Sequence, residues 1–140
     1  MGLTQLIYCS RRSDDLRPEG LFSIRDQAVW NNAHRDLTGV LLFNRDRFLQ
    51  CLEGERRTVT ATFCTICQDA RHEEIALMSV RDIVERSFPD WSMGLVDGDS
   101  ASLRAAIGDV LTTDRFDPEG MPAETTITLM QRMRTLRFAY

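Results

Sequence analysis

The first third of the chain shows two patterns of apolar residues. Residues 3–9 form a short apolar run bounded by polar residues, which predicts a first strand. Between Glu19 and His34 apolar residues recur at the spacing of a helix, and the apolar stripe ends in Asn31 and Asn32. The pattern therefore predicts a strand followed by a helix that carries two amides on its inner face.

A hairpin is predicted next. Residues 38–43, TGVLLF, are apolar enough for a central strand, and residues 47–53 return as its partner. Asn44 and Asp46 lie between the two runs, where their side chains can satisfy the hydrogen bonds of a tight turn.

The middle of the chain completes an alternating order of elements. Residues 55–70 have helical periodicity, and residues 75–84 and 91–96 read as two further strands. The order is β-α-β-β-α-β-β, which predicts an α+β fold of the ferredoxin-like kind, with two helices on one face of the sheet.

The pattern changes beyond Asp97. Residues 101–111 and 124–138 are predicted helices, separated by a turn-rich segment. We therefore expect a core over residues 1–97 and a helical extension over residues 98–140 that packs on this core. The last predicted helix has one apolar face, formed by Leu129, Met133, Leu136 and Tyr140.

Strand alternation places polar side chains among apolar ones. Gln50 shares a face with Phe48 and Leu52, and Tyr8 shares a face with Leu6. If these faces meet the helices, a phenol and an amide lie buried and each needs a hydrogen-bond partner. The same alternation puts three residues of the last strand on one face, Trp91, Met93 and Leu95. The pattern suits either the polar end of a ligand slot or a hydrogen bond within an ordinary core.

Composition narrows the class of protein. Hydrophobic residues make up 43% of the 140 residues, which is enough for one folded domain. The net charge of −4 argues against a nucleic-acid surface. The chain contains no lysine, which excludes Schiff-base chemistry and a P-loop. No run is long enough to span a membrane and the N-terminus does not resemble a signal peptide, so we expect a cytoplasmic protein.

The four cysteines are expected to be reduced thiols. Cys64 and Cys67 form a C-x-x-C pair, but the pair falls deep inside the second predicted helix. A redox motif of the thioredoxin type needs its first cysteine at a helix N-terminus, where the helix dipole lowers the thiol pKa. His34 and His72 have no cluster of further ligands near them in the sequence, so no metal site is expected.

Five short motifs occur in order along residues 1–97. They are Tyr8 in the first strand, N-N-x-x-x-x-L-T-G-V-L-L from Asn31, F-L-Q-C-L-E-G from Phe48, D-x-R-H at Asp69 and W-S-M-G from Trp91. Together these motifs resemble the BLUF family, the sensors of blue light using flavin. The resemblance implies a ferredoxin-like fold and noncovalently bound FAD.

The resemblance also implies a photochemical switch. Tyr8 matches the family's electron and proton donor, and Gln50 matches the glutamine that links this tyrosine to the flavin. Met93 and Trp91 match the family's switching residues on the last strand. By this resemblance the chain is a photoreceptor and not an enzyme.

The remaining matches concern flavin binding. Asn32 matches the asparagine that bonds the carbonyl edge of the ring, with Asn31 beside it. Ile24 and Ile66 match the apolar residues that hold the ring between the two helices. The polar edge of the flavin is matched by Asp69 and Arg71. Thr65 departs from the family, because some members have a basic residue there.

Two other classes remain open from the sequence alone. A small ferredoxin-like enzyme, such as an acylphosphatase-like hydrolase, would need a phosphate-binding loop after the first strand, and residues 10–20 lack a glycine-rich cradle. The other class is an interaction module that does not respond to light. If the sensor interpretation holds, a separate downstream protein or a second copy in a homodimer would receive the signal.

Overall fold

The computed structural model describes residues 2–14, 16–108 and 117–133. Its core confirms the predicted order of strands and helices. The elements in chain order are β1 (Leu3–Arg12), α1 (Pro18–Arg35), β2 (Thr38–Phe43), β3 (Arg47–Glu55), α2 (Arg56–Ile66), β4 (His72–Ile83), β5 (Gly94–Asp97), α3 (Ala101–Ile107), a 3₁₀ turn η1 (Pro118–Gly120) and α4 (Ala123–Met133).

The five strands form one mixed sheet in the order β4-β1-β3-β2-β5. Strands β1, β3, β2 and β4 pair antiparallel, and β5 joins the far side of β2 in parallel. The confirmed fold is thus ferredoxin-like, with a fifth strand added at the edge. β1 and β3 occupy the centre of the sheet and are paired on both sides, which fixes their side-chain alternation.

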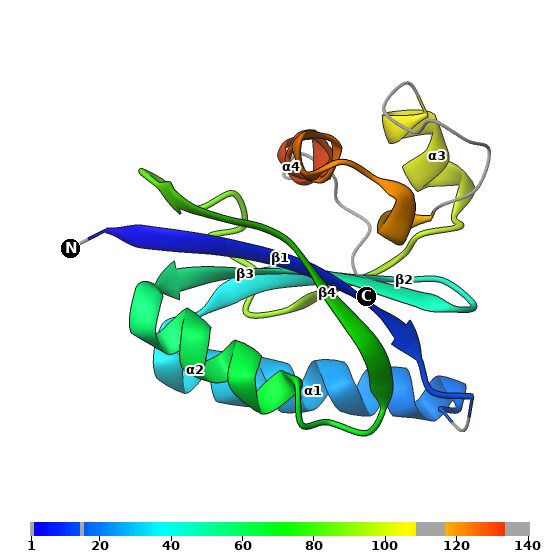
Figure 1. Ribbon diagram of the computed structural model, residues 1–140, viewed down its shortest axis with the longest axis horizontal. Coiled ribbons are helices and arrows are strands. Elements are labelled where there is room, and N and C mark those ends of the chain that lie inside the picture. The colour runs from blue at the N-terminus through cyan, green and yellow to red at the C-terminus, as the bar shows by residue number, and fades with distance from the viewer. Residues whose placement is uncertain (1, 15, 109–116, 134–140) are drawn as a thin grey trace.

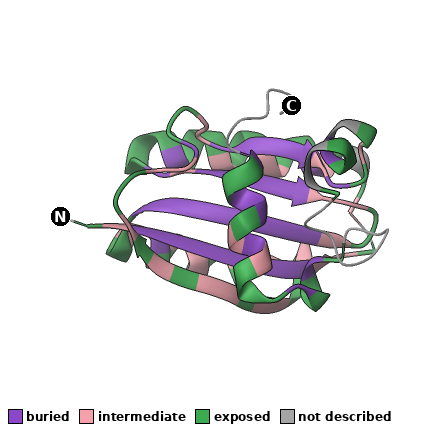
Figure 2. Cartoon of the chain, turned by 90° about the horizontal axis from the view of Figure 1, so that it is seen from above, coloured by how far each residue is buried: buried purple, intermediate pink, exposed green. Residues whose placement is uncertain are grey.

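Helices cover both faces of the sheet (Figure 1). α1 and α2 lie side by side under one face, as predicted, and α4 crosses the opposite face with α3 near one end. Seen from above, the strands are mostly buried while the helices keep an exposed outer side (Figure 2).

Each face of the sheet has its own apolar core. Between the sheet and α1/α2, the core includes Leu6, Leu41, Leu52, Val59 and Leu95. On the face under α4, the buried cluster contains Ile7, Val40, Leu49, Leu129 and Met130. β3 serves both cores, because Phe48 and Leu52 face one cluster while Leu49 and Cys51 face the other. This alternation is the one predicted from the sequence.

Element boundaries differ from the predicted ones in the second half of the chain. α2 ends at Ile66 and the last strand begins at Gly94, whereas the predicted helix extended to residue 70 and the predicted strand began at residue 91. Residues 67–71 instead form turns, and residues 89–93 form a turn and bends before β5. Leu129 and Met133 of the predicted apolar face are buried on the sheet, while Leu136 and Tyr140 lie outside the described residues.

Two backbone positions fix the approach to the site. Gly39 on β2 lies so close to β3 that a Cβ there would stand 1.9 Å from the Cys51 carbonyl oxygen. Asp36 ends α1 with a left-handed φ of 54°, and its N–H donates to the Asn32 carbonyl. The chain therefore turns at once from α1 into β2, which keeps Asn32 next to the sheet.

Candidate functional site

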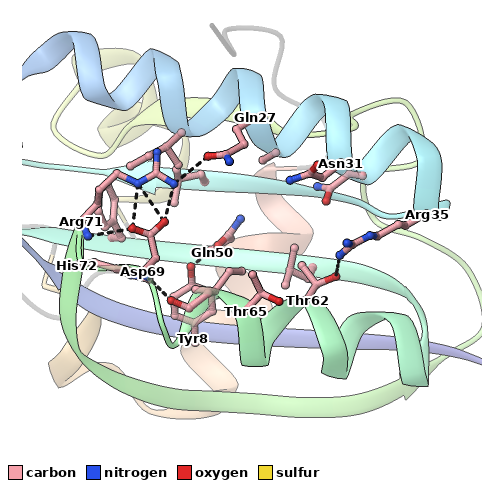
Figure 3. A pocket seen from close by; sticks show the side chains of 17 residues that line it. Tyr8, Gln27, Asn31, Arg35, Gln50, Thr62, Thr65, Asp69, Arg71 and His72 are labelled. Carbon is pink, nitrogen blue, oxygen red and sulfur yellow. Dashed lines mark hydrogen bonds and ion pairs between the residues drawn. The ribbon is translucent and has the colours of Figure 1, made fainter.

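A pocket lies between α1, α2 and the sheet (Figure 3). Its walls are apolar on both sides, with Ile24 and Ala28 on α1 and Ile66 on α2. Phe48 and Leu52 of β3 form part of its floor. Asn31, Arg35 and Thr65 at its rim are exposed. A slot of this form suits a flat aromatic ring.

Tyr8 and Gln50 meet at the floor of this pocket. They are cross-strand partners on β1 and β3, and the Tyr8 hydroxyl donates to Gln50 Oε1. Both side chains are buried. Burial raises the pKa of Tyr8 above its ordinary value, and the nearby Cys67 and Asp69 raise it further. Tyr8 is therefore held as a neutral phenol that donates its hydrogen bond.

The other end of the Gln50 amide points to sulfur. Gln50 Nε2 donates to Met93 Sδ at 3.5 Å. A thioether is a weak acceptor, so this amide N–H keeps donor capacity for a stronger acceptor placed in the pocket. The ring nitrogens and carbonyl oxygens of a flavin are acceptors of this kind. The described residues thus fit a flavin both in shape and in hydrogen-bonding capacity.

Asn32 connects the pocket to the segment before β5. Its side chain is buried and its Nδ2 donates to the Ser92 carbonyl at 2.8 Å. The Gly39 N–H donates to the Trp91 carbonyl at 2.9 Å. Residues 91–92 are consequently attached to both α1 and β2.

An ion pair occupies one end of the slot. Arg71 Nε donates to Asp69 Oδ1 at 2.9 Å, and Arg71 Nη2 reaches Gln27 Oε1 on α1 at 3.0 Å. The hydrogen bonds from Arg71 lower the pKa of Asp69. The pair therefore remains charged near neutral pH and links the turn after α2 to α1.

Most of the predicted binding residues line this one pocket. The lining includes Tyr8, Ile24, Asn31, Asn32, Gln50, Ile66, Asp69 and Arg71. Met93 contacts Gln50 without lining the pocket.

Trp91 lies elsewhere, on the opposite side of the sheet. It stacks on Phe88, with the ring centroids 5.4 Å apart, and packs against the core under α4. The expectation that Trp91 and Met93 share a face is wrong, because both residues precede Gly94 and so lie outside the alternation of β5.

Sequence reasoning missed several residues of the pocket. His72 lines it, and its imidazole contacts the Ser10 hydroxyl at 2.8 Å and the Ile66 carbonyl at 2.9 Å. Its place in the D-x-R-H motif was the available signal. The other lining residues outside the predicted set are Gln27, Ala28, Arg35, Leu41, Phe48, Leu52, Thr62 and Thr65.

The described residues contain neither a candidate metal site nor a helix that could span a membrane. They contain no group of three or more histidine, cysteine or acidic side chains that could hold a metal ion. None of their helices is both long and apolar enough to cross a membrane. All four cysteines are free, with Cys9 and Cys51 buried and Cys64 and Cys67 exposed.

Known proteins resemble this chain in both sequence and structure. The blue light- and temperature-regulated antirepressor BluF of Escherichia coli K12 is 37% identical over 95 residues, which cover 68% of this chain and 24% of that protein. The photoactivated adenylate cyclase subunit beta of Euglena longa is 29% identical over 111 residues, or 79% of this chain and 13% of that protein. The chain thus spans about a quarter or less of these curated relatives.

Solved structures match over nearly the whole chain. BlrB, a BLUF protein in its dark state, has a TM-score of 0.82 and 32% identity over 95% of this chain and 96% of that one. The photo-activated state of BlsA has a TM-score of 0.87 and 26% identity over 96% of each chain. The sequence pattern of the family described as sensors of blue-light using FAD matches residues 3–94. The chain therefore belongs to the BLUF family of blue-light sensors, whose cofactor is FAD.

Proposed function

We propose that this chain is a photoreceptor whose signal is the reversal of the Gln50 side-chain amide. The observation that carries the proposal is the hydrogen-bonded chain in which Tyr8 and Gln50 meet at the floor of the slot and Gln50 contacts Met93 behind it. The phenol donates to one end of the amide, and the other end donates only to a sulfur atom. Only the bond to the phenol is strong, and a phenol oxygen can accept a hydrogen bond as well as donate one, so either end of the amide can bond to Tyr8.

The residues of the chain would act in a short sequence. A bound flavin supplies light absorption and, once excited, a strong oxidant. Tyr8, held in place by its hydrogen bond to Gln50, would be the residue that donates one electron and then its phenolic proton to the excited flavin. Both return when the charges recombine, so Tyr8 ends as it began and no substrate is consumed. The net change is the reversed amide.

Reversal exchanges a donor and an acceptor at almost no steric cost. Gln50 Oε1 would then face Met93. Because an amide oxygen carries no hydrogen, it cannot donate to the Met93 sulfur, and the hydrogen bond between the two residues is lost. Gln50 Nε2 would face the Tyr8 oxygen, which accepts. The loss of the amide–sulfur contact would loosen Met93 and, through the backbone, the segment that contains Trp91.

We further propose that the signal leaves through a partner. The curated relatives are named as an antirepressor and as subunits of adenylate cyclases, and this chain matches only a small part of each. A separate downstream protein would read the position of β5 and the helices over the opposite face of the sheet. A second copy of the chain, as a homodimer, is the other receiver that the fold allows.

Spectroscopy of the purified chain tests the proposal. We expect a yellow protein whose flavin bands shift to longer wavelength under blue light and return in darkness.

Tyr8→Phe should keep the flavin and lose the shift, because only the phenolic donor is removed. Gln50→Ala should do the same by removing the amide. A full photocycle in either variant would exclude this mechanism, and a colourless protein that also rejects added FAD would exclude the photoreceptor function.

A further inference from the structure

Arg35 lies in the last turn of α1 and lines the same pocket. Its guanidinium reaches across the slot to α2, where Nη1 stands 3.5 Å from Thr62 Oγ1 (Figure 3). This distance makes a long, weak hydrogen bond. The side chain is exposed at the rim, so it faces both the slot and solvent.

Arg35 differs from the other arginine of the pocket. Arg71 has its charge balanced by Asp69 within the slot. Among the residues that the structure describes, no ion pair involves Arg35, and the adjacent Asp36 pairs with Arg86 at 3.3 Å. The Arg35 end of the slot therefore carries an uncompensated positive charge.

A guanidinium in this position is suited to an anion with several oxygens. Its planar set of N–H donors matches the geometry of phosphate, and a charge-assisted bond of this kind is stronger than a bond between neutral groups. The Thr62 hydroxyl is a second donor on the facing helix. The two side chains are already within 3.5 Å of each other, so one phosphate can contact both.

We propose that Arg35, with Thr62, binds the phosphate that follows the ribityl chain of the flavin. This group is present in FMN and FAD and absent from riboflavin. The inference rests on the proposed flavin slot and adds to it a determinant of which flavin is retained. It assigns no part of the photochemistry to Arg35.

Flavin affinities of the flavin-free 140-residue chain test this assignment. Quenching of flavin fluorescence gives Kd for riboflavin, FMN and FAD. We expect FMN and FAD to bind about tenfold or more tightly than riboflavin, since one charge-assisted hydrogen bond contributes roughly that factor. Arg35→Gln should weaken FMN and FAD to the level of riboflavin and leave riboflavin unchanged. Thr62→Val should reduce the preference by less.

The matched control is Arg25→Gln, which changes the net charge equally on the same helix. Arg25 pairs with Asp26 and stacks on Phe22, outside the pocket, so the preference for phosphate should survive. Added salt should reduce the ratio between the Kd of riboflavin and the Kd of FMN or FAD in the wild-type chain, because salt screens the charge of an exposed site.

Four outcomes would overturn the assignment. Equal affinity for riboflavin and FMN in the wild-type chain would exclude the phosphate contact but would still support the flavin slot. A preference that survives in Arg35→Gln assigns the phosphate to other residues. A loss confined to FAD places Arg35 at the adenylyl part instead. Failure of all three flavins to bind the wild-type chain would overturn the slot itself together with this assignment.

Discussion

Two properties distinguish Tyr8 from a solvent-exposed tyrosine. It is completely enclosed, and its hydroxyl has one defined acceptor, Gln50. Burial is the first cause of its raised pKa. A phenolate would also stand near the charge of Asp69, so the folded protein resists ionisation of Tyr8 well above the ordinary pKa.

This raised pKa gives stability a dependence on alkaline pH. The unfolded chain releases the Tyr8 proton near pH 10 while the folded chain retains it, so the contribution of Tyr8 is complete below pH 10 and falls as pH rises further. Between pH 10 and pH 11.5 the wild-type chain should lose more unfolding free energy than Tyr8→Phe, approaching about 1.4 kcal/mol per pH unit. Urea unfolding of both chains measures the difference. Parallel curves would show that Tyr8 ionises as readily in the folded state.

Glu53 is a second buried polar residue, on the same strand as Gln50. Its carboxylate is fully enclosed and accepts hydrogen bonds from Gln5 Nε2 at 2.9 Å, Ser87 N at 3.1 Å and Phe88 N at 2.9 Å. It therefore fastens the segment between β4 and β5 to the centre of the sheet. The sequence motif F-L-Q-C-L-E-G contains Glu53, but its spacing alone does not reveal these partners.

Removing this carboxylate should cost much of the protein's stability. Glu53→Ala leaves two backbone N–H groups and one amide without an acceptor, and each unsatisfied buried group costs about 1–3 kcal/mol. We expect the free energy of unfolding to fall by about 3 kcal/mol or more in urea titrations. Glu55→Ala, at the exposed end of the same strand, is the control and should change it by less than about 0.5 kcal/mol. Equal effects would mean that the hydrogen bonds of Glu53 contribute nothing.

Among the elements, β3 followed its sequence pattern and the segment before β5 did not. β3 is paired on both sides, so the faces of Phe48, Gln50 and Leu52 could be predicted from alternation alone. Residues 91–93 have a strand-like composition, but the turn after Phe88 and the hydrogen bond that Asn32 Nδ2 donates to the Ser92 carbonyl keep them out of the ladder. Tertiary contacts therefore overrode the local pattern there.

Gly94 allows Trp91 to fold back on the start of β5. A Cβ at Gly94 would stand 2.5 Å from Trp91 Cε3, so Gly94→Ala should force the indole out of its stack on Phe88. We expect a loss of about 1–3 kcal/mol in unfolding free energy. The emission of Trp91 should also move to the red, measured in a Trp30→Phe background because Trp30 is the only other tryptophan.

Gly2→Ala serves as the control for this variant, since nothing lies within 4 Å of the added methyl group. Unchanged emission and stability in Gly94→Ala would show that the indole has room to move without losing its contacts.

The C-x-x-C pair lies at the end of α2, not inside a longer helix. Cys64 is in the last turn and Cys67 is the C-cap, and both are exposed. Slight desolvation of the Cys67 thiol by its neighbours, and then the nearby Cys64, raise the pKa of Cys67, which disfavours the reactive thiolate. The position differs from the predicted one, yet the argument against a redox motif still applies, because the pair is far from the helix N-terminus.

Replacing both thiols should therefore leave the light response intact. We expect Cys64→Ser with Cys67→Ser to keep the size of the spectral shift and its dark recovery time within about twofold of the wild-type chain, where twofold corresponds to roughly 0.4 kcal/mol. Absorbance after a light pulse, with and without a reductant, measures both. A recovery time that depends on reductant in the wild-type chain alone would restore the redox interpretation.

At the scale of the whole molecule, the sheet separates a flavin-sized slot from a second covered face. The sequence predicted the order of elements and most of the slot, because periodicity and motif spacing both report on them. It could not predict that Arg35 and His72 reach the slot, since their places depend on where α1 and α2 end. The packing of Leu129, Met130 and Met133 on the opposite face likewise follows from the three-dimensional structure.

Light should alter the protection of this second face. Trp91 packs against the cluster that contains Leu129, Met130 and Met133, so loosening of the segment before β5 would reach α4. Hydrogen exchange compared in darkness and under blue light should show faster exchange in β5 and in residues 123–133, while α2 stays constant. A change in β5 without any change in residues 123–133 would indicate that the signal leaves by another route.

The edge position of β5 limits the kind of movement that can carry such a signal. Leu95 and Val96 are both fully enclosed, one in each of the two cores. A slide along β2 by one residue would exchange these side chains between opposite faces, and a slide by two residues would require about 6.6 Å of travel. Reversal of one amide cannot drive either displacement. We therefore expect β5 to be either paired with β2 or detached from it. Light would change the fraction of molecules in which β5 is paired, and the receiver would detect that fraction and not a gradual displacement of the strand.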